Sequence, residues 1–236
     1  GWSLTKCVYD QTLGDGTTPA GWASQDAVHV YDELYLTNPH TVGMHLTGYR
    51  GAHANRIRCF DLGGGAIANT DGFRFGCVDS FFSNLDCGGM YTGNAFYVDT
   101  YNSRFVNCKG WYGGKNGFHI VGSRNNFSSC EAQDNIQHGW LIDGIYNTFA
   151  SIAADSNSYD YSPSGAITGR TYNGINLVGG GNTIESFAAF DKNESARGIR
   201  QVYGLYIDNA ATQCVVSGHS SSNFTAGVGL EATFDT

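Results

Sequence analysis

Residues 117–120 read Gly-Phe-His-Ile, and residues 139–142, one period of 22 residues later, read Gly-Trp-Leu-Ile. The same four-residue pattern, called the phrase below, recurs along the chain. It consists of a small residue, an apolar residue, any residue and a second apolar residue. Its first apolar residues are Met44, Phe73, Phe96, Phe118, Trp140, Ile175, Leu205 and Val228. Most intervals between them are 22 or 23 residues. A period of this size is typical of stacked repeats rather than of one globular core.

A second apolar side chain follows most of these residues nine positions later. The set is Phe82, Phe105, Phe127, Phe149 and Ile184, with Val215 displaced by one position. Asn, Asp, Gly and Ser, which form tight turns, lie between the phrases, so each unit reads as short strands broken by turns. Helical repeats are disfavoured because the chain has 33 glycines and few strong helix formers. The dense leucines of leucine-rich repeats are also absent.

The pattern therefore predicts a parallel β-helix with at least seven coils between residues 42 and 230. Neighbouring coils would lie about 4.8 Å apart, as strands do in a sheet, and the preferred crossover makes the helix right-handed. Both apolar sets would form ladders inside it. Glycine and asparagine would occupy the corners, because they accept left-handed backbone angles. Two longer intervals indicate loop insertions over residues 155–172 and 191–203.

Through this repeat the chain resembles the right-handed parallel β-helix (pectin-lyase-like) superfamily, over about residues 42–236. The predicted fold class is all-β, a right-handed single-stranded parallel β-helix with about 22 residues per coil and two loop insertions. We expect one domain over residues 1–236, with an irregular start over 1–41 and regular coils over 42–236. The first and last repeats are incomplete, so we expect a piece of a longer chain.

Composition limits the partners. A net charge of −8 argues against nucleic acid and acidic membranes; it suits a neutral glycan and mildly repels a polyanionic one. No stretch has the length and apolarity of a membrane span. The seven cysteines include no Cys-x-x-Cys pair, so a zinc site is not expected. Cys108 and Cys130 occupy equivalent positions and are expected to be buried thiols rather than a disulfide. No cofactor or metal site is predicted, and a structural or catalytic Ca²⁺ is left open.

The residues that point outward from the first phrase form a candidate active site. Asp99, His119 and Asp143 would lie on consecutive or alternate coils, where carboxylates and a histidine could supply acid and base. Asp99 and Asp143, two coils apart, would be separated by roughly 9.6 Å, near the carboxylate spacing of inverting glycoside hydrolysis. Arg74 and Tyr97 would hold a sugar, by charge-assisted bonding and by stacking. The alternative is that these side chains are ordinary solvent-exposed strand residues without a catalytic or binding role.

A competing surface follows the second phrase. Trp111, Glu131 and Asp155 point outward there, and Arg197 lies in the second insertion. Insertions in solenoids often gather on the binding side. These four residues are therefore predicted to bind substrate in a groove walled by the insertions, unless the loops only cover the sheet.

Residues 69–73, Asn-Thr-Asp-Gly-Phe, are similar to a catalytic segment of polygalacturonases. The other motifs of that family are missing: its Asp-Asp pair is replaced by Ala95-Phe96, and only Gly218-His219-Ser220 approaches Gly-His-Gly. Polygalacturonase activity is therefore not expected, and Asp71 is predicted to lie in a turn.

The β-helix hosts many functions, so the step from fold to function is an analogy. The incomplete ends and aromatic-rich surface resemble the central domain of a bacteriophage tailspike or polysaccharide depolymerase. This resemblance implies binding and cleavage of a bacterial surface polysaccharide by a glycoside hydrolase or lyase, in a homotrimer. The location implied is extracellular, on a phage virion tail or as a secreted protein. The alternatives are a secreted polysaccharide lyase, hydrolase or epimerase, and a non-enzymatic carbohydrate-binding adhesin or fibre shaft.

Overall fold

The structure, a computed structural model, describes residues 2–10, 28–37, 39, 42–60, 71–90, 92–158, 171–190, 201–221 and 230–232. These residues form twenty β-strands and no helix. The strands are β1 (Trp2–Asp10), β2 (Val28–Thr37), β3 (Val42–Arg50), β4 (His53–Phe60), β5 (Asp71–Val78), β6 (Phe81–Gly88), β7 (Phe96–Val98), β8 (Arg104–Val106), β9 (Lys109–Trp111), β10 (Phe118–Ile120), β11 (Asn126–Ser128), β12 (Glu131–Gln133), β13 (Trp140–Ile142), β14 (Thr148–Ala150), β15 (Ala153–Asp155), β16 (Ile175–Leu177), β17 (Thr183–Phe190), β18 (Leu205–Ile207), β19 (Val215–Ser221) and β20 (Leu230–Ala232).

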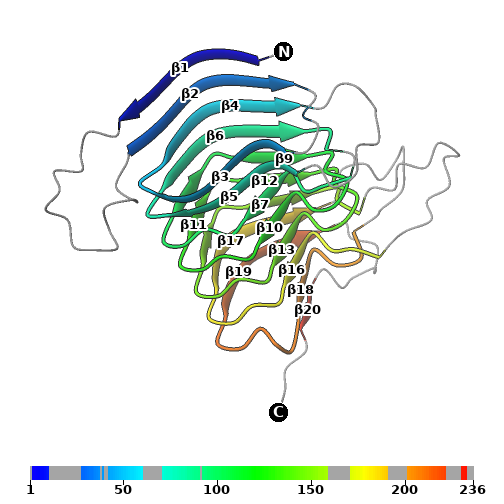
Figure 1. Ribbon diagram of the computed structural model, residues 1–236. Helices are drawn as coiled ribbons and strands as arrows, with labels where there is room; N and C mark the ends of the chain where they lie inside the picture. Colours follow the sequence, from blue (N-terminus) through cyan, green and yellow to red (C-terminus); the bar gives the residue numbers. More distant parts are fainter. Residues whose placement is uncertain are drawn as a thin grey trace, which may run out of the picture.

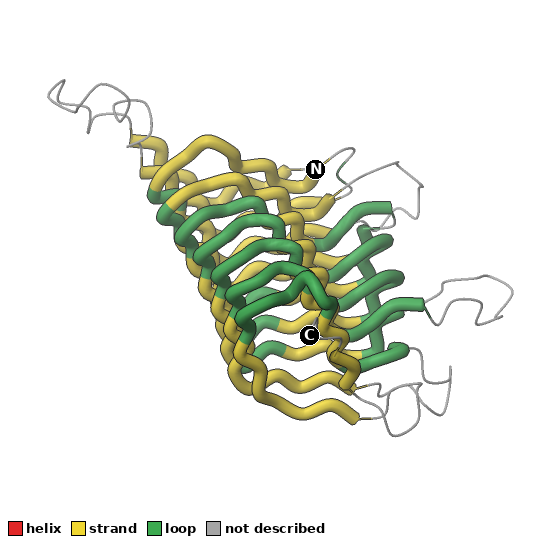
Figure 2. Tube along the Cα trace, turned by 90° about the horizontal axis from the view of Figure 1, so that it is seen from below, coloured by secondary structure: helices red, strands yellow, loops and turns green. Residues whose placement is uncertain are grey.

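The strands stack into two sheets that face each other. One has eight strands in the order β20-β18-β16-β13-β10-β7-β5-β3, and the other has twelve, from β1 through β17 to β9. Successive coils lie side by side in both (Figure 1), and strands lie over strands and loops over loops when the molecule is turned by 90° (Figure 2). Pairing is parallel from β2 onwards. The chain is a right-handed parallel β-helix, as predicted.

Both predicted apolar ladders are confirmed. The first comprises Met44, Phe73, Phe96, Phe118, Trp140, Ile175 and Leu205, and the second comprises Phe82, Phe105, Phe127, Phe149 and Ile184; all are buried. Phe96, Phe118 and Trp140 pair across adjacent strands at intervals of 22 residues. The Phe118 and Trp140 rings stack with centroids 4.1 Å apart. Equivalent positions of successive coils therefore build one continuous core. In the last coil Leu205 pairs with Leu230, which differs from the predicted register; Val228, the residue that the repeat predicts there, lies outside the described residues.

The glycine that opens most of the phrases is favoured by the close approach of neighbouring chain segments, although Ala95 occupies this position in one coil. A Cβ on Gly117 would lie 2.6 Å from Asn135 Nδ2 and 2.8 Å from the methyl group of Ala132. Gly139 and Gly174 face similarly close backbone and side-chain atoms of the neighbouring coil. The repeat therefore records a packing constraint as well as a turn.

The corners only partly match the prediction of glycine and asparagine. In one row of corners, residues of successive coils all have positive φ: Glu33, Arg56, Asn84, Asn107, Ser129, Ser151 and Ser186. Left-handed backbone costs a non-glycine residue about 1–2 kcal/mol. Hydrogen bonds between coils offset this: the Ser129 N–H donates to Ala150 O at 3.0 Å, and the Ser151 N–H to Glu185 O at 2.9 Å. Repeated pairing thus imposes the conformation on residues that do not favour it.

The twelve-stranded sheet extends upstream of residue 42. β2 pairs in parallel with β4, and β1 pairs antiparallel with β2. Among the cysteines with described side chains all are free thiols, and Cys108 and Cys130 are buried as expected. No described helix could cross a membrane.

Candidate functional site

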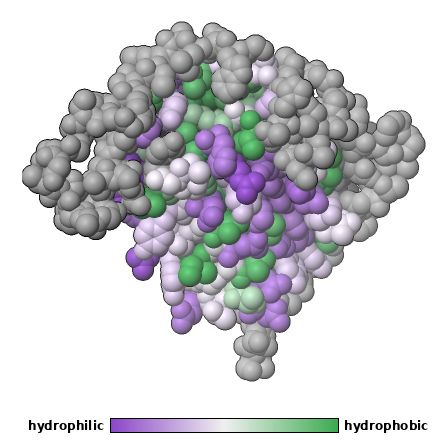
Figure 3. Space-filling view, viewed as in Figure 1, coloured by the Kyte–Doolittle hydropathy of each residue, from purple (hydrophilic) through white to green (hydrophobic). Residues whose placement is uncertain are grey.

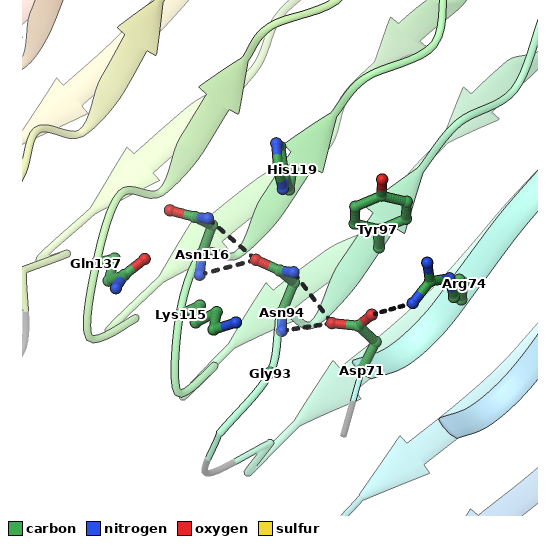
Figure 4. A pocket seen from close by; sticks show the side chains of 9 residues that line it. All are labelled: Asp71, Arg74, Gly93, Asn94, Tyr97, Lys115, Asn116, His119 and Gln137. Atoms are coloured by element: carbon green, nitrogen blue, oxygen red, sulfur yellow. Dashed lines mark hydrogen bonds and ion pairs between the residues drawn. The ribbon is translucent and has the colours of Figure 1, made fainter. Parts of the chain in front are cut away.

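A pocket of about 410 Å³ lies on the outer face of the eight-stranded sheet. Hydrophilic side chains gather in the middle of this face among a few hydrophobic ones (Figure 3). The residues that line the pocket come from β5, β7 and β10 and from the turns that precede β7, β10 and β13. They are Asp71, Arg74, Gly93, Asn94, Tyr97, Lys115, Asn116, His119 and Gln137 (Figure 4).

The predicted outward row is confirmed as a structural feature. Arg74, Tyr97 and His119 are the middle residues of β5, β7 and β10, and they pair in register. The Arg74 guanidinium lies over the Tyr97 ring, 4.6 Å from its centroid, and the His119 ring meets Tyr97 edge-on at 5.3 Å. Three side chains predicted to act on a sugar therefore stand in contact along three coils.

His119 is held by Asp143, the residue that directly follows the strand of the next coil, β13. Its Nε2 lies 2.7 Å from Asp143 Oδ2. An ionised carboxylate only accepts hydrogen bonds, so Nε2 carries the proton and the lone pair of the neutral ring is on Nδ1. Asp99 directly follows β7, two strands before Asp143; its exposed carboxylate makes no hydrogen bond or ion pair with the described residues. Neither aspartate lines the pocket.

Asp71 is the first residue of β5, and it does not lie in a turn as predicted. Its side chain is 9% exposed, and the carboxylate accepts hydrogen bonds from the backbone N–H and the side-chain amide of Asn94, at 2.9 and 3.0 Å. Its other oxygen lies 3.6 Å from the Arg74 guanidinium. Stacked pairing extends the strand backwards to Asp71, and this outweighs the turn preference of Asp-Gly.

A ladder of polar side chains continues from Asp71 along the edge of the sheet. Asn116 donates to Asn94 Oδ1 through both its backbone N–H, at 3.2 Å, and its side-chain amide, at 3.0 Å. The His138 backbone N–H donates to Asn116 Oδ1, and the Asn173 N–H donates to His138 Nδ1 at 3.0 Å. Burial lowers the pKa of His138 to about 4, so its ring is neutral near pH 7. The ladder fixes two amides in the pocket wall.

Sequence reasoning missed this ladder, although a signal for it exists. The residue just before each small-apolar phrase is polar or aromatic in six coils: Asp71, Asn94, Asn116, His138, Asn173 and Tyr203. Lys115 and Gln137, which also line the pocket, immediately precede two of these positions and belong to no strand.

The second predicted surface lies on the twelve-stranded sheet, away from His119. The Trp111 indole Nε1 donates to Asp86 Oδ1 at 2.8 Å, and Glu131 pairs with Lys109 at 3.3 Å. Asp155 does not point outward as predicted: it is only 4% exposed, and its carboxylate accepts a hydrogen bond from the Ser156 hydroxyl. Arg197 lies outside the described residues. The structure therefore divides the predicted substrate-binding residues between two sheets.

The pocket offers an acid–base group, cations and amide hydrogen-bond donors. His119 touches the pocket and Asp143 orients it from behind, which is the arrangement of a general base with its orienting group. Lys115 makes no ion pair with the described residues, whereas Arg74 is partly neutralised by Asp71. The pocket is thus locally cationic on a chain of net charge −8. Among the described residues, no three His, Cys, Asp or Glu side chains are grouped to hold a metal ion.

No family model and no curated protein sequence matches the chain. Solved structures similar to it include pectate lyase Pel9A, with 14% identity, 88% of this chain and 68% of that chain covered, and a TM-score of 0.46. The Azotobacter vinelandii mannuronan C-5 epimerase AlgE4 A-module has 14% identity, 87% and 62% coverage, and a TM-score of 0.46. The enzymatically active domain of tailspike protein 2 from bacteriophage CBA120 has 11% identity, 87% and 40% coverage, and a TM-score of 0.47. This chain spans between 40% and 68% of their lengths.

Proposed function

We propose that this protein binds a bacterial surface polysaccharide on its eight-stranded sheet and cleaves it in the pocket at His119. The observation that carries the proposal is the His119–Asp143 pair, 2.7 Å apart, at the wall of a pocket that also holds Arg74 and Lys115. An adhesin needs no oriented histidine, so this pair favours an enzyme over a binding module.

The reaction that this geometry supports best is β-elimination at an acidic sugar. Lys115 and Arg74 would bind the carboxylate of a uronate and make the neighbouring C5–H more acidic. His119 Nδ1 would take the C5 proton, and Asp143 would stabilise the imidazolium that forms. The electron pair of the C–H bond forms the C4–C5 double bond, the C4–O glycosidic bond breaks, and the departing oxygen takes a proton from water.

The test is incubation with uronate-containing capsular polysaccharides, alginate and polygalacturonate, followed by ultraviolet absorbance of unsaturated ends. Loss of a general base lowers a rate by about 10²–10⁴-fold, so His119→Gln should fall in that range. Asp143→Asn should also slow the reaction, because His119 loses the carboxylate that holds its tautomer and orientation. His45→Gln is the matched control, because His45 is exposed in the same outward row two strands before Tyr97. Wild-type rates for His119→Gln would refute the assignment.

Hydrolysis by Asp99 and Asp143 is a second candidate, supported by the unpaired, exposed carboxylate of Asp99 two strands away. It would produce reducing ends without ultraviolet absorbance, and Asp99→Asn would abolish it. If Asp99→Asn and Asp143→Asn both cleave at the wild-type rate, the catalytic site is elsewhere. The surface predicted around Glu131, Asp155 and Arg197 would then be the next candidate.

The setting of this activity remains a prediction: outside the cell, on a phage virion tail or as a secreted protein, with chains assembled as homotrimers. Sedimentation equilibrium of the protein measures the assembly directly. A monomer at micromolar concentration would contradict the trimer.

A further inference from the structure

An aromatic strip runs along the outer face of the twelve-stranded sheet, on a different sheet from the pocket. It consists of Tyr35, Phe60, Trp111 and Tyr112. Ring centroids are 6.0 Å apart for the first pair, 5.6 Å for Phe60 and Trp111, and 5.3 Å for Trp111 and Tyr112. Tyr35 is 44% exposed and Tyr112 is 38% exposed. The two ends of the strip are thus exposed, and Phe60 and Trp111 between them are half-buried.

The strip follows the axis of the β-helix. Phe60 pairs with Gly88, and Gly88 pairs with Trp111, in the parallel register of β4, β6 and β9. Tyr35 precedes them on β2, opposite Arg58 of β4. The line from Tyr35 to Trp111 therefore runs across β2, β4, β6 and β9, with successive ring centroids 6.0 and 5.6 Å apart. A linear partner lying along the helix axis would meet one ring after another.

The central ring of the strip is fixed in place. Trp111 lies on Gly88, where a Cβ would come within 2.5 Å of the indole. Its Nε1 donates to Asp86 Oδ1 at 2.8 Å, and Phe60 meets it at an interplanar angle of 62°. A rigid ring loses little conformational entropy when a ligand stacks on it.

The charged side chains beside the strip are paired with one another, and this indicates which kind of ligand the strip would bind. Asp86 receives the Trp111 N–H and lies 3.9 Å from Arg58. Lys109 lies 3.3 Å from Glu131 and donates to Gln133 at 2.7 Å. Among the described residues beside the strip, a charged polymer would find no charge without an ion-pair partner. A pyranose chain, however, has flat C–H faces that suit the negative faces of aromatic rings, and hydroxyl groups that suit the flanking carboxylate and amide.

We propose that the aromatic strip is a second glycan-binding surface, which holds a linear polysaccharide through the uncharged faces of its pyranose rings. A protein partner fits less well, because the strip is about one ring wide and a stable protein interface buries about 800 Å² on each partner. This surface does not depend on the cleavage proposed at His119, and it would serve equally in a protein that binds without cleaving.

The test uses a neutral β-glucan and cellohexaose, whose equatorial hydroxyls leave both ring faces free for stacking. The wild-type protein should migrate more slowly in a native gel containing the β-glucan and should bind cellohexaose in calorimetry. Trp111→Ala and Tyr35→Ala should each weaken binding by about three- to tenfold, the range of one aromatic stacking contact. His119→Gln should bind as the wild type does, which separates this surface from the catalytic proposal.

Tyr146→Ala is the matched control, since Tyr146 is an exposed tyrosine, 56% accessible, at a different corner of the coil. It should bind normally. The proposal is overturned if the wild type binds neither probe, or if Trp111→Ala and Tyr35→Ala bind as the wild type does. Binding that disappears in 0.5 M salt would also contradict it, because exposed charge pairs are screened at that ionic strength and stacking is not. A change of sedimentation mass in Tyr35→Ala would identify the strip as an interface between chains instead.

Discussion

The aromatic core predicts a large and specific penalty for Phe127→Ala. Phe127 is fully buried, with ring centroids 4.7 Å from Phe105, 5.0 Å from Phe149 and 6.0 Å from Trp140. The first two pairs are stacked and the third is edge-on. Hydrogen bonds between coils fix the strand spacing above and below, so the walls of the new cavity cannot collapse. We therefore expect a loss of about 3–5 kcal/mol in the free energy of unfolding.

Thermal unfolding followed by circular dichroism measures this loss. A change of 1 kcal/mol shifts the Tm of a domain of this size by about 2–4 °C, so the variant should melt about 6–20 °C lower. Phe127→Leu keeps most of the volume and should lose less than about 1.5 kcal/mol. Tyr146→Ala, at an exposed position, should stay within about 0.5 kcal/mol of the wild type. A Tm for Phe127→Ala within 2 °C of the wild type would refute the assignment of Phe127 to a rigid internal stack.

Two further predictions concern the small-residue and polar rows. Gly117→Ala places a Cβ 2.6 Å from Asn135 Nδ2, and the free energy of unfolding measured in urea should fall by about 1–3 kcal/mol. Ala95→Gly at the equivalent position should lower it by no more than about 1 kcal/mol. Equal losses in the two variants would contradict the packing explanation. His138, whose pKa burial lowers to about 4 in the folded state, contributes stability that is present above its unfolded pKa of about 6.5 and is lost as pH falls to 4. This loss of folding free energy amounts to about 3 kcal/mol. His138→Asn puts in the ladder the residue that neighbouring coils have at this position. The free energy of unfolding of this variant should therefore depend less on pH between 6.5 and 4. An unchanged slope in that variant would show that other groups cause it.

The fold could be predicted from the sequence because the same side chain returns to the same place in every coil. Phe105, Phe127 and Phe149 are 22 residues apart, and a parallel register stacks them directly. The period therefore carries both the secondary structure and the tertiary contacts. The same period predicts where the middle residue of each phrase points. Arg74, Tyr97 and His119 could therefore be placed on one face.

The corners and the ends of the coils were harder to predict, because many residue types can occupy them. Ser129 and Ser151 adopt left-handed angles that their own preferences do not indicate. In the last coil the interval from Leu205 to its partner Leu230 is two residues longer than the interval from Leu205 to Val228, the residue that the repeat predicted. Local preference is weak at such positions, and the pairing of neighbouring coils decides the conformation.

The candidate site was predictable only where it lies on strands or directly after them. The spacing of Asp143 and His119 placed them on one patch. It did not predict that His119 pairs with Asp143, while Asp99 has no partner among the described residues, because this pairing depends on side-chain direction and not on the period. Lys115 and Gln137 lie in turns, where the repeat carries no information about direction. A β-helix thus makes its strand residues predictable and leaves the turns free to vary, and the pocket is built where these two meet. Lys115, the cation without an ion pair among the described residues, therefore comes from a turn, whereas Arg74 and the proposed general base His119 come from strands. Exchanging Lys115 for glutamate should thus alter which sugars bind and leave the fold and the His119–Asp143 pair unchanged.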